Sequence, residues 1–117
     1  MKYISVLDPQ IINAADGDLF PIEHTNGVHI YNKAIEHECR GKVIVSLGTW
    51  GATDGIFHHC SPDEDELCVI SSGTVKITNQ DGEQMTFSAG QGFIIEHGFN
   101  GTWESIGNVR KWYVIYK

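Results

Sequence analysis

Two adjacent histidines and a cysteine precede a run of acidic residues and an apolar segment in the stretch GIFHHCSPDEDELCVISSG. Imidazole, thiolate and carboxylate groups are the side chains that bind divalent metal ions in proteins. We expect zinc, manganese or iron, held mainly by His59 and Glu66, with a third residue completing the site. The candidate ligands are His58, His59, Cys60, Glu66 and His97.

The same stretch has a second interpretation, without a metal ion. SPDEDE is then a solvated acidic loop, His58 and His59 are surface or hydrogen-bonded histidines, and Glu66 marks the start of a strand. Adjacent residues of a strand point to opposite faces, so both histidines cannot easily bind one ion. Both interpretations remain open from the residues alone.

The alternation of a strand predicts which of these side chains point the same way. In an extended chain, Phe57 and His59 share one face. Glu66, Cys68 and Ile70 share a face of the next segment, and its two apolar members indicate that it points inward. A carboxylate buried there needs a partner, because an unpaired charge in an apolar site is costly. A metal ion or a protonated histidine would serve.

Composition limits the classes of function. A chain of 117 residues with 41% hydrophobic residues is long and apolar enough for one folded domain, which we expect to span 1–117. The net charge of −7 opposes binding to nucleic acid and to anionic membranes. A small-molecule ligand is the expected partner.

Cysteine usage and the first residues indicate a cytoplasmic protein. Cys39, Cys60 and Cys68 are odd in number and form no C-x-x-C pair, which favours reduced thiols. The beginning, MKYISVLDPQ, has no apolar run long enough for a signal peptide, and no later segment is long and apolar enough for a membrane span.

Short apolar runs separated by glycines predict an all-β sandwich or barrel. Ser72-Gly73 and Asp81-Gly82 are turn signals between these runs. One helical turn is possible near the N-terminus, with Asp8 as its cap and Pro9 at its first position. The expected strands are 28–32, 43–50, 66–71, 74–79, 83–88, 92–97 and 111–117.

From Trp50 onward the chain resembles the cupins. Glu66 and Gly73 have the seven-residue spacing of the first cupin motif, and SAGQGFIIEHGFNGTW follows the second, with Gly90 and Gly98 in place. Within cupins it is most similar to the ureidoglycine aminohydrolase-like group, through DELCVISSGTVKITNQDGE, AGQGFIIEHGFNGTWE and VRKWYVIYK. The resemblance implies a cupin-type double-stranded β-helix, or jelly-roll barrel. Its core would cover about 43–117, with 1–42 packing on the barrel or at a homodimer interface.

The metal motif is only partly kept in this resemblance. His59 and Glu66 match two of the four usual ligands by position. Ser61 and Gly101 stand where the other two histidines fall, and Thr102 stands where the aminohydrolases place a ligand. The fold therefore implies a metal site that this chain has partly lost.

The resemblance also implies a ligand pocket with a cation near it. Trp112 and Tyr113 are adjacent, so at most one faces inward. Lys111 and Lys117 are the cationic candidates, and related enzymes use the lysine of a terminal Tyr-Lys near the substrate. Glu66 and Lys117 are the catalytic candidates. The expected pocket residues are Phe57, Cys68, Phe93, Thr102, Trp103 and Tyr113.

Three functions follow as alternatives. The first is a cupin that binds a small polar or anionic metabolite, with metal-assisted hydrolysis or deamination of a ureido or amino compound, in which Glu66 is ligand or base. The second is a metal-free ligand-binding or regulatory module. The third is a metal-independent isomerase or epimerase, with His59 and Tyr113 as its acid–base pair.

Overall fold

The fold is known from a computed structural model that describes residues 2–3 and 20–116. The helical turn expected at Asp8 and Pro9 lies outside these residues, as does Lys117. The described residues contain no helix that could cross a membrane. Within the described residues, eight antiparallel strands form one sheet: β1 (Phe20–Thr25), β2 (Val28–Cys39), β3 (Lys42–Ala52), β4 (Gly55–Ser61), β5 (Asp65–Thr78), β6 (Gln84–Ser88), β7 (Gly92–Ile95) and β8 (Phe99–Tyr116).

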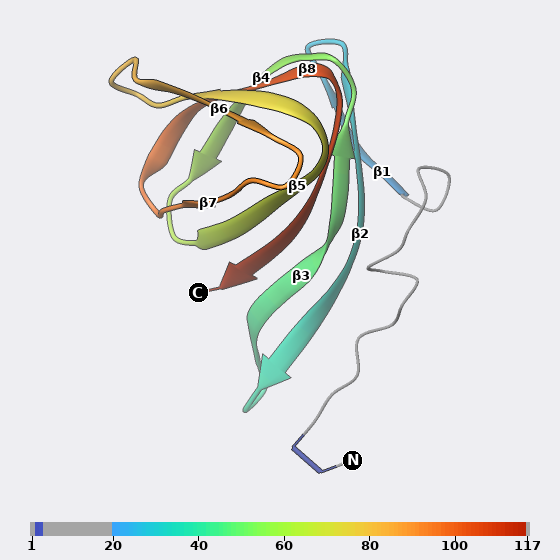
Figure 1. Ribbon diagram of the computed structural model, residues 1–117. Helices are drawn as coiled ribbons and strands as arrows, with labels where there is room; N and C mark the ends of the chain where they lie inside the picture. Colours follow the sequence, from blue (N-terminus) through green and yellow to red (C-terminus); the bar gives the residue numbers. More distant parts are fainter. Residues whose placement is uncertain (1, 4–19, 117) are drawn as a thin grey trace.

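The long strand β8 connects the parts of the sheet (Figure 1). Its first half pairs with β4 and with the end of β5, while its second half pairs with β3 and with the start of β5. Strands β6 and β7 both pair with β5, and the β2–β3 hairpin extends away from this barrel. The prediction of an all-β barrel is therefore confirmed.

One predicted turn is wrong. Ser72 and Gly73 do not reverse the chain, because β5 continues through them with a shift of register against β8. Gly73 has a φ of +85°, and a Cβ there would lie 2.2 Å from the carbonyl oxygen of Asn108. The glycine thus lets β5 bulge and bend along the barrel wall, so that the two expected strands are one.

The second predicted turn is confirmed. The amide of Gly82 donates to the carbonyl of Asn79 at 3.0 Å, and the chain reverses from β5 into β6. The expected strands did not include β1, β4 or residues 99–110 of β8. Polar side chains such as Asn100 and Asn108 obscured that part of β8, and both are exposed.

The core lies inside the barrel, where alternate residues of the strands point. Glu66, Cys68 and Ile70 are buried together, as the alternation predicted. Tyr113 is buried while Trp112 is 46% exposed, which confirms that only one of the two faces inward. The interior therefore contains a carboxylate, a thiol and a phenol among its apolar side chains.

Candidate functional site

A buried ion pair lies in the barrel interior. The carboxylate of Glu66 on β5 accepts a hydrogen bond from the ammonium of Lys111 on β8, with Oε2 and Nζ 2.5 Å apart. The thiol of Cys68 donates to the same oxygen at 3.1 Å. The side chains of Lys111 and Glu66 are only 5% and 6% exposed. The partner that a buried Glu66 was expected to need is therefore a lysine.

Three aromatic rings surround the ammonium of Lys111. Its Nζ lies 4.5 Å from the ring centre of Trp50, 4.7 Å from that of Trp103 and 5.7 Å from that of Tyr113. The faces of such rings attract a cation, and more strongly where water is excluded. The carboxylate and the rings together compensate the lysine for its lost hydration.

The pair stays ionised because each charge supports the other. Burial raises the pKa of Glu66, but the charge and hydrogen bond of Lys111 outweigh it and hold the pKa below its ordinary value. Burial lowers the pKa of Lys111, and the negative charge of Glu66 more than reverses this effect. Burial raises the pKa of Cys68 to about 12, so this thiol is neutral. Neither Lys111 nor Cys68 is therefore a nucleophile at neutral pH.

His59 faces the same interior from β4. Its ring packs on Phe99, with ring centres 5.9 Å apart, and its Nε2 is buried without a hydrogen-bond partner among the described residues. Burial and then the charge of Lys111 lower its pKa, although Glu66 acts in the opposite direction. His59 is thus a neutral imidazole with one nitrogen available to a ligand.

The residues in this interior do not fit a divalent metal ion. The ammonium of Lys111 occupies Oε2 of Glu66, and its positive charge would repel a metal ion beside it. Gly101 pairs with His59 across β4 and β8, and a Cβ on it would lie 2.0 Å from the carbonyl oxygen of Thr78. Within 2–3 and 20–116, no three His, Cys, Asp or Glu side chains gather closely enough to hold an ion.

Restoring the missing histidine should fail. We expect Gly101→His to lower the free energy of unfolding by about 1–3 kcal/mol, because its side chain overlaps the backbone of β5. We also expect no tight zinc binding. Urea unfolding and zinc calorimetry measure both, with Asn108→His, at an exposed position of β8, as the control. A Gly101→His protein that keeps its stability and binds zinc tightly would contradict the conclusion that this interior does not fit a metal ion.

The other candidate metal ligands lie apart from the buried pair. His58 is exposed and bonds to the side chain of Asn100, and Cys60 is an exposed free thiol. His97 is exposed and its Nδ1 lies 2.9 Å from Asp65. The structure therefore brings Glu66 and His59 into one interior and leaves these three outside it.

The pair of His97 and Asp65 predicts a small pH effect. Asp65 raises the pKa of His97 by a hydrogen bond and by its charge. A raised histidine pKa stabilises the fold below the pKa of the unfolded state, and this effect is lost as pH rises through the folded pKa. His97→Gln should therefore lower the melting temperature slightly at about pH 5.5 and not at about pH 9. An equal loss at both values would exclude the ion pair as its cause.

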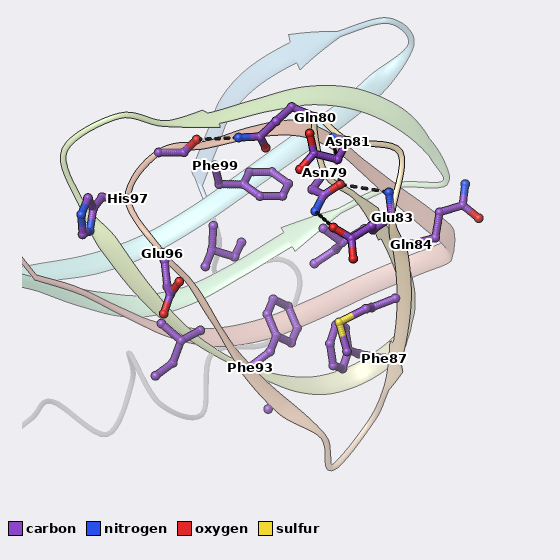
Figure 2. Close-up of a pocket in the computed structure, with 16 residues that line it drawn as sticks. Asn79, Gln80, Asp81, Glu83, Gln84, Phe87, Phe93, Glu96, His97 and Phe99 are labelled. Carbon is purple, nitrogen blue, oxygen red and sulfur yellow. Dashed lines mark hydrogen bonds between the residues drawn. The ribbon is translucent and has the colours of Figure 1, made fainter.

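A cavity of about 740 Å³ opens beside this interior, between the β5–β6 turn, β6, β7 and the start of β8 (Figure 2). The rings of Phe87, Phe93 and Phe99 point into it, while His97 and Gln84 lie at its edge. Phe87 and Phe93 stack with ring centres 4.2 Å apart. The cavity thus has an aromatic floor and a polar rim.

Two floor residues connect the cavity to the buried pair. Phe93 packs against Trp103, with ring centres 6.3 Å apart, and Phe99 packs against His59. Trp103 is in turn one of the rings around Lys111. The charged interior therefore lies directly beneath the cavity floor.

The six expected pocket residues do not gather in one place. Phe93 lines the cavity, and Thr102 lies opposite His58 in the β4–β8 ladder. The remaining four are core residues around the ion pair: Phe57, Cys68, Trp103 and Tyr113. The hydroxyl of Tyr113 donates to Asn32 on β2 at 2.7 Å, and the indole of Trp103 donates to Ser105 at 3.0 Å.

Sequence reasoning missed part of the site. Lys111 was expected near the pocket, but nothing in the sequence paired it with Glu66. Phe87 and Phe99 were missed as floor residues, although Phe87 lies in an expected strand whose alternation could have placed it inward. The contact between Asn32 and Tyr113 had no sequence signal, because it joins residues 81 positions apart.

Comparison with known proteins agrees with this barrel. The sequence profile described as the EutQ-like cupin domain matches residues 41–113. A search of curated proteins found no match. Among solved structures, the chain is similar to the EutQ protein of Clostridium difficile, with 21% identity, a TM-score of 0.69 and coverage of 82% of this chain and 75% of that one.

Two further structures show the same barrel. The cupin domain of Schizosaccharomyces pombe Cnp3 is 16% identical, with a TM-score of 0.64 and coverage of 75% of this chain and 64% of that one. A DUF861 family protein of Thermotoga maritima is 27% identical, with a TM-score of 0.54 and coverage of 57% and 75%. The predicted cupin-type jelly-roll barrel is thus confirmed, and the chain belongs to the family of EutQ-like cupin domains.

Proposed function

We propose that this protein is a metal-free ligand-binding cupin whose ligand occupies the cavity above Phe87, Phe93 and Phe99. The observation that carries the proposal is the cavity itself, with its aromatic floor and polar rim. Apolar walls with a few polar groups are typical of small-molecule sites. The volume of about 740 Å³ suits a small metabolite.

The charges around the cavity favour a neutral or amine-bearing ligand. Its described lining contains the carboxylates of Asp81, Glu83 and Glu96 and no lysine or arginine. The amide of Asn79 already donates to Glu83 at 3.2 Å, which orients that carboxylate. An anionic ligand was expected because of Lys111 and Lys117, but Glu66 neutralises Lys111. The proposed ligand has an apolar part for the floor and a hydroxyl or amino group for the rim.

The other two functions have less support. Metal-assisted hydrolysis or deamination, which the ureidoglycine aminohydrolase-like group suggests, needs a metal that the interior does not fit. An isomerase would need His59 and Tyr113 to share a substrate. Burial raises the pKa of Tyr113, and its hydroxyl is already bonded to Asn32 on β2, so it is poorly suited to exchange protons at neutral pH.

A thermal-shift screen tests the proposal. Small amines, alcohols and carboxylates are added to the protein in the presence of EDTA. We expect an amine or alcohol to raise the melting temperature, because a ligand that binds only the folded state stabilises it. The Phe93→Ala variant should reduce the affinity for such a compound at least about tenfold, by removing an aromatic wall of the site.

The matched control is Ile106→Ala, which shortens an exposed apolar side chain of β8 that is 52% accessible. This variant should bind like the wild type. Equal weakening in both variants, or stabilisation by carboxylates alone, would contradict the proposed site.

A further inference from the structure

One oxygen of the Glu66 carboxylate already has two partners from its own chain. Lys111 Nζ and Cys68 Sγ both bond to its Oε2, at 2.5 and 3.1 Å. Glu66 is the residue that matches the glutamate ligand of the cupin metal motif, and His59 matches one of its histidines. The ammonium of Lys111 therefore contacts the residue that would hold a metal ion in a complete cupin motif.

The surroundings of Lys111 stabilise its own positive charge and disfavour a second cation beside it. The faces of Trp50 and Trp103 lie within 4.7 Å of Nζ and stabilise its positive charge. A divalent ion binds a carboxylate oxygen at about 2.0–2.2 Å, which is the space that the ammonium fills. Two cations on one buried oxygen would repel each other strongly. A metal ion on Oε2 of Glu66 would require Lys111 to leave its place.

We infer that the Lys111 ammonium is a built-in substitute for the divalent cation, so that the positive charge that balances Glu66 is supplied by the chain itself. The charge does not depend on the supply of a metal. It differs from a metal ion in having no ligand position for water or substrate. Lys111 thus balances the buried carboxylate of Glu66 without supplying the Lewis acid of a metal site.

This substitution also gives His59 a different role from that of a metal ligand. Its Nε2 is buried and unpartnered among the described residues, beneath Phe99 of the cavity floor. Lys111 already neutralises the carboxylate of Glu66. The imidazole of His59 therefore needs neither a metal ion nor an added proton to balance that charge. Nε2 of His59 can therefore form a hydrogen bond with a molecule that reaches beneath the cavity floor.

The experiment uses the wild-type protein with zinc or manganese alone, after removal of bound metal with EDTA. Lysine and histidine side-chain nitrogens are followed by ¹⁵N NMR. We expect a slowly exchanging Nζ signal from Lys111, and we expect the signals of Lys111 and His59 to stay unchanged through a metal titration. Shifts in both signals that saturate with one added equivalent of metal would overturn the inference.

A second measurement compares two lysines by acylation with an amine-reactive ester and mass spectrometry. Lys76 is the matched control, because it also pairs with a glutamate, Glu104 at 3.3 Å, but its side chain is 36% exposed. We expect Lys111 to react at least about tenfold more slowly than Lys76, since its ammonium is accessible only after local opening. Equal rates would overturn the inference. Neither measurement contains a cavity ligand, so neither result decides whether the cavity binds a small molecule, which the thermal-shift screen tests separately.

Discussion

Replacing Lys111 with Met is expected to lower the free energy of unfolding by about 3–5 kcal/mol, because it leaves the carboxylate of Glu66 buried without its counter-ion. Both side chains of the pair are almost completely buried, so solvent cannot screen the loss. Met is close to Lys in length and apolar, which limits the loss of packing. Urea unfolding at neutral pH, followed by tryptophan fluorescence, measures the change.

The double variant Glu66→Gln/Lys111→Met separates charge from packing. It removes both charges, so we expect it to recover most of the stability that Lys111→Met loses. The coupling energy of the two substitutions should be at least about 2 kcal/mol, the magnitude of a buried pair in direct contact. Additive losses would mean that Lys111 stabilises the barrel by packing alone and not by its charge.

Trp103→Ala is expected to lower the free energy of unfolding by about 3–5 kcal/mol, as is usual for loss of a large buried aromatic residue. Trp103 is 2% exposed and packs on Trp50 and Phe57. Its ring also faces the ammonium of Lys111 and supports Phe93 at the cavity floor. The substitution should therefore weaken both the core and the ligand site, which urea unfolding and the thermal-shift screen would show.

Trp112→Ala is the matched control on the same strand. Trp112 is 46% exposed on the outer face of β8, so its loss should cost at most about 1 kcal/mol. A similar loss of stability in both variants would contradict the assignment of Trp103 to the interior and Trp112 to the surface. A large effect of Trp112→Ala that depends on protein concentration would instead support the expected homodimer.

The sequence was informative where strand alternation decides which way a side chain points. It placed Glu66 and Cys68 together in the interior, and it allowed only one of Trp112 and Tyr113 to face inward. The Asp81-Gly82 turn was also correctly predicted, because its local chemistry is sufficient to reverse the chain. These features depend on residues that are close together in the sequence.

Long-range pairing could not be predicted in the same way. Glu66 and Lys111 are 45 residues apart, and they meet only because β5 and β8 pair in one particular register. Gly73 resembled a turn residue, and its role in bending β5 depends on the nearby carbonyl of Asn108. The cavity likewise depends on β6, β7 and β8 meeting at one end of the barrel.

The proposed function depends most directly on whether a molecule binds in the cavity without metal. A compound from the screen is titrated into methyl-labelled protein in EDTA, with the methyl signals of Ile77, Met85 and Ile95 as reporters of the cavity lining. The outer-face residues Ile56 and Ile106 serve as references. We predict saturable shifts confined to the three reporters. Shifts that appear only after metal is added, or only at the references, would contradict a metal-free ligand site.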